Sequence, residues 1–158
     1  MVFDNPFSAR SCGGENQLID LVSLEAEMYD PIPDLHTMFQ LYDLQFFDGK
    51  LGGCVVEWSK RMKTSAGLCY YQPATGMVTI RLSEPLLKFR PRRDFVETLL
   101  HEMIHAYLFV TERCMEHNNH GPKFQAHMYR INSLANTRIS IYHAFHAEVA
   151  HYRNKKKK

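Results

Sequence analysis

The segment from Phe95 to Val110 constrains the fold more than any other part of this sequence. It is largely apolar on every side of a helical wheel, yet it contains His101, Glu102 and His105. A helix that is hydrophobic all round lies through the centre of its domain. Because an unpaired charge in such a place costs several kcal/mol, these three side chains need polar partners or a metal ion.

The spacing of these polar residues favours a metal site. His101 and His105 stand four positions apart, so a helix places both imidazoles on one face, one turn from each other. Two such nitrogens can reach one Zn²⁺ at about 2.0–2.1 Å, and Glu102 is close enough to reach a water on the metal. This His-Glu-x-x-His pattern is typical of zinc hydrolases. The alternative, two satisfied core histidines and a surface glutamate, fits poorly because so apolar a segment leaves hardly any surface position.

A hydrolytic zinc site also needs a third protein ligand and an open coordination position. The residue six positions after His105 is Thr111, which excludes the metzincin arrangement. The downstream candidates are Cys114, Glu116, His117 and His120. Spacing favours His120 over His117, because the Gly-Pro pair that follows His120 can hold its imidazole in a tight turn at the start of a helix.

The remaining pattern predicts a single α+β domain. Asp34 can cap a helix over residues 35–47, the buried helix is expected from Pro91 to about Arg113, and Pro122 can open a further helix to about Leu134. Three runs rich in β-branched and aromatic residues predict an antiparallel three-stranded meander over 54–58, 66–71 and 77–82. The expected organisation is a flexible leader over 1–16, the domain over 17–154 and a basic tail over 155–158.

The charges are split unevenly along the chain of 158 residues. Residues 1–49 carry one basic and nine acidic side chains, whereas the rest carries 18 basic and eight acidic ones, so the formal net charge is only +2. A basic body of this kind often binds a polyanion, most commonly nucleic acid. The plain alternative is a solubilising charge pattern.

Two basic clusters lie close to aromatic residues in the sequence. The basic residues are Lys60, Arg61 and Lys63 in one cluster, and Lys88, Arg90, Arg92 and Arg93 in the other. Their aromatic neighbours are Trp58, Tyr70, Tyr71 and Phe89. Such pairing suits single-stranded or distorted DNA, since basic groups bind phosphates while rings stack on bases. The alternative is a solvated face with core aromatics, and Trp58, in a strand, is expected in the core.

The cysteines and the N-terminus indicate a reducing compartment. Four cysteines stand far apart without a Cys-x-x-Cys pair, and the first 14 residues lack the basic head and apolar stretch of a secretory signal. We therefore expect free thiols rather than disulfides. The longest apolar run is interrupted by the polar residues described above, so no membrane span is expected.

Several longer stretches carry a family resemblance. They are residues 101–111, the motif His120-Gly121-Pro122-x-Phe124, and the stretches 81–88, 130–134 and 30–35. Together they closely resemble the SprT-like metalloprotease domain over about residues 29–153. The resemblance implies a zincin-like single domain, in which a small sheet packs on the buried catalytic helix and further helices flank it.

The resemblance also implies the chemistry and the partners. The family's third zinc ligand is the histidine of its His-Gly-Pro motif, so one Zn²⁺ is expected on His101, His105 and His120, with Glu102 as the general base. Members of this kind are DNA-dependent proteases that degrade proteins covalently trapped on DNA. The chain is thus expected to act in DNA–protein crosslink repair, in the nucleus and on chromatin, with DNA and DNA-bound proteins as its partners.

Departures from the family pattern bear on those partners. The DNA-dependent members carry a second zinc-binding module with cysteine and histidine ligands after this domain, and here no cysteine follows Cys114. Their motifs for ubiquitin, the sliding clamp and a segregase are likewise not expected in this chain, which is interpreted as a fragment or a short relative. Asn119 stands where the family has a glycine before the third ligand.

The sequence leaves three alternatives open. Tyr107, Tyr129 or His127 can serve as a second donor to the oxyanion of a reacting peptide. The strand over 77–82 either pairs along its edge with an extended substrate or lies inside the sheet. The chain is either a protease switched on by DNA or a DNA-binding scaffold that keeps a structural zinc, and Glu102 favours the protease because a structural site has no use for it.

Overall fold

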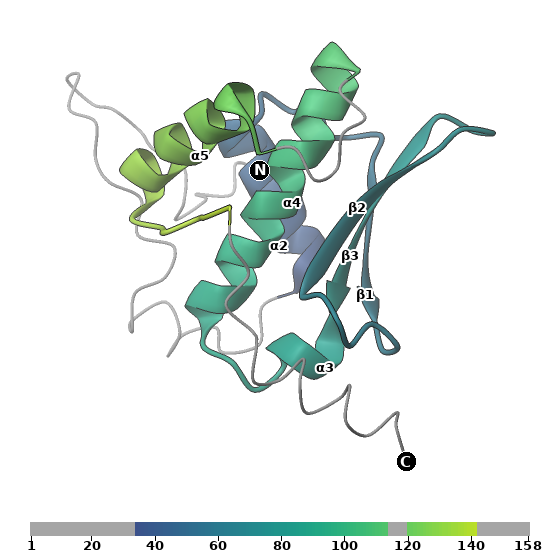
Figure 1. Cartoon of the computed structure of the whole chain (residues 1–158), viewed down its shortest axis with the longest axis vertical. Coiled ribbons are helices and arrows are strands. Elements are labelled where there is room, and N and C mark those ends of the chain that lie inside the picture. The colour runs from purple at the N-terminus through teal and green to yellow at the C-terminus, as the bar shows by residue number, and fades with distance from the viewer. Residues whose placement is uncertain (1–33, 114–119, 142–158) are drawn as a thin grey trace, which may run out of the picture.

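The structure, a computed structural model, describes residues 34–113 and 120–141. A long central helix organises this part of the chain. The elements are α2 (Leu35–Phe46), β1 (Val55–Ser59), β2 (Gly67–Gln72), β3 (Met77–Ser83), α3 (Glu84–Leu87), α4 (Arg92–Glu112) and α5 (Pro122–Ala135). Figure 1 shows α4 in the middle, with the sheet along one side and α5 along the other. The expected α+β class is confirmed.

Some expectations fall outside the described residues. They concern the leader over 1–16, the alternative ligands Cys114, Glu116 and His117, the position Asn119, and the tail over 155–158. Within the described residues, no helix combines the length and the apolar character that a membrane span requires.

The central helix α4 has the burial that its sequence predicts. Its polar centre is enclosed, with His101 5% exposed, Glu102 4% and His105 9%. The enclosure comes from several directions, because α4 contacts β2, β3, α2 and α5. The helix ends where Arg113 adopts a left-handed backbone (φ 55°) and its N–H bonds back to the carbonyls of Leu108 and Phe109. The polar side chains of α4 therefore lie inside the domain.

The caps of the two flanking helices also follow the sequence. The Asp34 carboxylate accepts hydrogen bonds from the Thr37 N–H at 3.0 Å and the Thr37 hydroxyl at 2.6 Å, which satisfies the first turn of α2. Pro122 is the first residue of α5. An N–H at this position would have no partner within the helix, so proline is tolerated there. These caps fix where α2 and α5 begin.

The sheet differs from the predicted meander. Its strand order is β1-β3-β2, with β2 antiparallel to β3 but β1 parallel to it. The expectation of three antiparallel strands is therefore wrong for β1. The strand β3 is the central one, which confirms the interior alternative for 77–82 and makes edge pairing of that strand with a substrate wrong. The outer edges of this sheet belong to β1 and β2.

The segment between β1 and β2 explains the strand order. The Ser59 hydroxyl accepts a hydrogen bond from the Met62 N–H at 3.1 Å, and the Ser83 hydroxyl at the end of β3 donates to the Met62 carbonyl. These bonds hold the segment across the end of β3. The strand β2 therefore begins on the side of β3 opposite to β1. The central place goes to β3, whose inward residues Ile80 and Leu82 are fully buried.

The thiols of Cys54 and Cys69 are free, as expected. Burial raises the pKa of Cys54 to about 11 and raises that of Cys69 as well.

Because only the thiolate is nucleophilic, iodoacetamide should alkylate Cys54 at pH 8 about a hundredfold more slowly in the folded than in the unfolded protein. The folded-state rate should keep rising up to about pH 11. Peptide mass spectrometry measures both rates, and equal rates in native buffer and in urea would contradict the prediction.

Candidate metal centre

Three histidine side chains converge between α4 and the start of α5. The Nε2 of His120 lies 3.1 Å from the Nε2 of His101 and 3.2 Å from the Nε2 of His105. Two nitrogens bound to one tetrahedral zinc at about 2.05 Å stand about 3.3 Å apart. The nitrogen spacings therefore fit a shared ion of this kind. The structure brings His120, the residue that spacing favours, onto the histidine pair of α4.

Neighbouring groups orient these imidazole rings. The Nδ1 of His101 lies 2.8 Å from the Ser140 carbonyl oxygen. Because a carbonyl can only accept, Nδ1 carries the proton and Nε2 keeps its lone pair for a metal. The Gln125 side-chain amide donates to the His120 carbonyl at 2.8 Å, which ties that residue to the first turn of α5.

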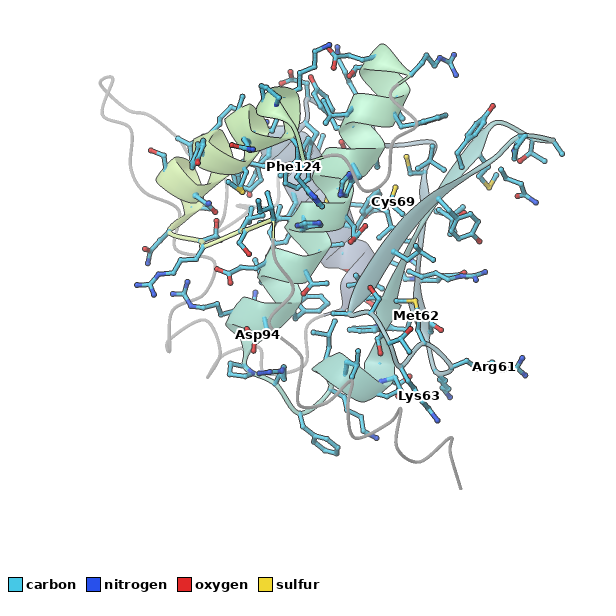
Figure 2. The ribbon with its side chains drawn as sticks, viewed as in Figure 1. Arg61, Met62, Lys63, Cys69, Asp94 and Phe124 are labelled. Atoms are coloured by element: carbon cyan, nitrogen blue, oxygen red, sulfur yellow. The ribbon has the colours of Figure 1, made fainter. Side chains whose placement is uncertain are left out.

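The ring of Phe124 forms the apolar support of the three histidines. It is 1% exposed and lies between α5 and α4 in Figure 2. Its centroid is 4.9 Å from that of His101, 4.7 Å from that of His105 and 4.7 Å from that of His120. One buried side chain thus touches all three candidate ligands, and its removal would loosen each of them.

The side chain of Glu102 is enclosed between α4 and the start of β2. A Cβ added at Gly67 would lie 2.8 Å from the Glu102 Cγ, so the strand backbone comes very close to this carboxylate. Burial raises the pKa of Glu102 to about 8 in the metal-free protein. A buried carboxyl next to a histidine cluster, with its pKa near neutrality, is suited to accept and release a proton.

The structure separates the three candidates for the second oxyanion donor. Tyr129 is 63% exposed on α5. The Tyr107 ring packs against Phe47 at 5.3 Å and His127 at 5.0 Å between ring centroids. His127 lies 3.2 Å from an Arg130 nitrogen, and burial together with this guanidinium lowers the pKa of His127. Tyr107 and His127 therefore belong to an aromatic cluster that packs on Phe47. The three histidines instead pack on Phe124, as described above.

The second basic cluster is split by burial and pairing. Arg92 is 3% exposed and its guanidinium lies 3.8 Å from the Met38 sulfur, so its expected role in DNA binding conflicts with the structure. The Arg92 side chain faces inward, whereas Arg90 and Arg93 are half-buried. Arg90 pairs with Asp94 at 3.5 Å and Arg93 pairs with Glu97 at 3.2 Å. Lys88 remains exposed just after α3.

The first basic cluster lies in the segment between β1 and β2, which a hydrogen bond joins to Ser83, the residue before α3. Lys60 and Arg61 are exposed and Lys63 is half-buried. Figure 2 shows Arg61 pointing away from the sheet and Lys63 beside α3. The Met62–Ser83 bond described above ties this segment to α3, which leads directly to Lys88. We call this set the basic–aromatic cluster; its members are Lys60, Arg61, Lys63, Lys88, Trp58 and Phe89.

The aromatic members of the cluster are accessible. Trp58 stacks on Phe95 with centroids 5.5 Å apart but stays 39% exposed, so the expectation of a core tryptophan is wrong. Phe89 is 88% exposed, and the Lys88 Nζ lies 4.8 Å from its ring centre. By contrast, Tyr71 packs on Phe109 at 4.3 Å and belongs to the packed side of the sheet.

The sequence pattern assigns no role to three contributors to the site. Phe124 is one helical turn beyond His120, and an aromatic residue in the first turn of α5 was a usable signal. Ser140 contributes only a backbone carbonyl, which any residue type would supply, so no signal existed. Gly67 contributes by having no side chain. The reason for a glycine at this position becomes visible only when β2 is packed against α4.

An α+β domain with His-Glu-x-x-His on its buried helix, and a third histidine before the next helix, has the architecture of zinc-dependent hydrolases. The chain belongs to the SprT-like family, which it matches over residues 35–143. The family assignment agrees with the resemblance seen in the sequence.

Similar proteins include DNA-dependent metalloproteases. The chain is 55% identical over 135 residues to the DNA-dependent metalloprotease SPRTN of Homo sapiens, covering 85% of this chain and 28% of that protein. It is 54% identical over 136 residues to the DNA-dependent metalloprotease dvc-1 of Caenorhabditis elegans, covering 84% of this chain and 37% of that protein. The chain thus spans roughly a third of the length of these relatives.

Proposed function

We propose that this chain is a DNA-dependent zinc metalloprotease domain that cleaves proteins crosslinked to DNA or tightly bound on it. The observation that carries the proposal is the convergence of three Nε2 atoms, 3.1 and 3.2 Å apart, next to a buried carboxylate. A purely structural metal site would be closed by four protein ligands and would have no use for Glu102. Within residues 34–113 and 120–141, the converging donors are the three histidines, and a set of three leaves an open position for water or substrate.

The proposed mechanism assigns one task to each group. His101, His105 and His120 hold the ion, and a zinc ion bound there supplies Lewis acidity and lowers the pKa of a bound water toward about 7. The Glu102 carboxylate takes the proton of the attacking water and passes it to the nitrogen of the leaving amine. The Ser140 carbonyl and Phe124 keep the imidazoles in place. The buried surroundings exclude bulk water, which strengthens the electrostatic interactions in the site.

The DNA part of the proposal rests on the basic–aromatic cluster and on the relatives described above, which are DNA-dependent metalloproteases. Exposed Lys and Arg side chains can bind phosphates while Trp58 and Phe89 offer faces for base stacking, as in single-strand binding sites. Its member Trp58 stacks on Phe95 near the start of α4, whereas His101 and His105 lie near the middle of that helix. We infer a protease that acts in the nucleus on chromatin, where its substrates occur.

The experiment that tests this function is cleavage of a basic DNA-binding protein such as a histone, with and without single-stranded DNA. The zinc-loaded chain should cleave the substrate in the presence of DNA and much more slowly without it. DNA binding and one bound zinc without any cleavage would instead support the scaffold alternative. Equal cleavage with and without DNA would contradict DNA dependence while leaving the protease assignment standing.

Charge reversal in the basic–aromatic cluster gives a sharper test of the DNA surface. The variant Lys60→Glu/Arg61→Glu should bind single-stranded DNA about tenfold more weakly, and the slope of log K against log salt should fall by about 1.4, because two phosphate contacts are lost. Fluorescence anisotropy over a salt series measures both. The exposed Lys50, outside this cluster, provides the control variant Lys50→Glu. If the slope were the same as that of the parent chain, the DNA-binding surface would lie outside this cluster.

A further inference from the structure

Gly67 approaches Glu102 more closely than any residue with a side chain could. An ideal Cβ at this position would lie 2.8 Å from the Glu102 Cγ, 2.9 Å from the Thr98 Cγ2 and 3.1 Å from a Glu102 carboxylate oxygen. The described glycines with positive φ are Gly49 and Gly76, so backbone conformation does not explain a glycine here. The available space explains the glycine, because β2 and α4 come very close together at this point.

Most of the groups around Gly67 are fixed. Its carbonyl accepts a hydrogen bond from the Ser65 hydroxyl at 2.7 Å, and the preceding Ala66 carbonyl accepts one from the Ser83 N–H at 2.8 Å. Thr98 is held by its own hydroxyl, which donates to the Asp94 carbonyl at 2.7 Å and so fixes the direction of its methyl group. The side chain of Glu102 is therefore the neighbour that would have to rotate away from a new Cβ.

We propose that Gly67 is a positioning residue for Glu102. Its missing side chain lets the β2 backbone close over the carboxylate, so that the carboxylate keeps one direction relative to the histidine triad. This inference rests on the proposed protease function, in which Glu102 moves a proton. A displacement of a catalytic group by about 1 Å can cost about a hundredfold in rate. The effect of a Cβ at Gly67 should therefore appear in the chemical step rather than in substrate binding.

The kinetic test compares Gly67→Ala with Gly53→Ala. A Cβ at Gly53 meets nothing within 4 Å, so that variant reports the general effect of a glycine-to-alanine change. Gly67→Ala is expected to lower kcat by about ten- to a hundredfold with KM within about twofold and one zinc ion still bound. Gly53→Ala should match the parent chain. A Gly67→Ala variant with parental kcat, or with a raised KM alone, would overturn the proposal.

A second measurement does not depend on protease activity. Gly67→Ala should lower the Tm of the parent chain by about 4 °C or more beyond its effect in a Glu102→Ala background, where the crowded Cγ is absent. Thr98→Ser removes the other crowded methyl group and keeps the hydroxyl, so it provides a folded background if Gly67→Ala alone does not fold. Equal Tm losses in both Glu102 backgrounds would overturn the inference. A parent chain without protease activity would instead overturn the proposed function, and the Tm comparison would still decide whether the two positions are coupled.

Discussion

Replacing Glu102 with glutamine is expected to lower kcat for DNA-stimulated proteolysis by about 10²–10⁴-fold, because the amide cannot accept the proton of the attacking water. Gln has nearly the same size as Glu, so the packing against Gly67 is preserved. Zinc content should stay at one ion per chain, since Glu102 is not among the three converging histidines. Gel-based cleavage of a histone with single-stranded DNA, together with metal analysis, measures both quantities.

The matched control is Glu112→Gln at the C-terminal end of the same helix. Glu112 is exposed and pairs with Lys123 at 3.2 Å, so this change removes a surface ion pair of small energetic value. Its cleavage rate and zinc content should equal those of the parent chain. If Glu102→Gln also cleaved at the parental rate, Glu102 would not be the proton acceptor, and the proposed mechanism would fail at its central step.

The helical part of the fold and two of the three converging histidines could be predicted from local patterns. The periodicity of α4 and the four-residue step from His101 to His105 are properties of one helix, so spacing alone defines their common face. His120 is harder because its place depends on the turn before α5. The Gly-Pro pair supplied enough of that signal to rank it above His117.

The parts that were wrong depend on contacts between distant segments. The strand order could not be deduced because the connection from β1 to β2 is long enough for either topology, and the Met62–Ser83 bond decides between them. Adjacent basic residues also look equivalent in the sequence, whereas the structure buries Arg92 and leaves Arg90 and Arg93 half-buried. A position one residue further along a helix faces a direction about 100° away, and only the docked helix shows which direction is inside.

Replacing Phe124 with alanine is expected to destabilise the domain by about 3–5 kcal/mol, because it empties a fully buried aromatic site. The same change removes the ring that packs on all three imidazoles, so the triad should lose part of its alignment. Zinc affinity should fall together with stability. Thermal unfolding with and without added zinc, followed by a competition titration with a chelator, measures both effects.

The comparison with Phe89→Ala separates support of the metal centre from DNA binding. Phe89 is 88% exposed, so its truncation should leave Tm and zinc affinity unchanged and weaken single-stranded DNA binding, since base–aromatic stacking is worth about 1–3 kcal/mol. Phe124→Ala should show the opposite pattern, with DNA affinity retained at temperatures where the variant is folded. If Phe124→Ala kept parental zinc affinity, the three histidines would be positioned by their own helices and the Ser140 carbonyl. The aromatic ring would then contribute only to the hydrophobic core.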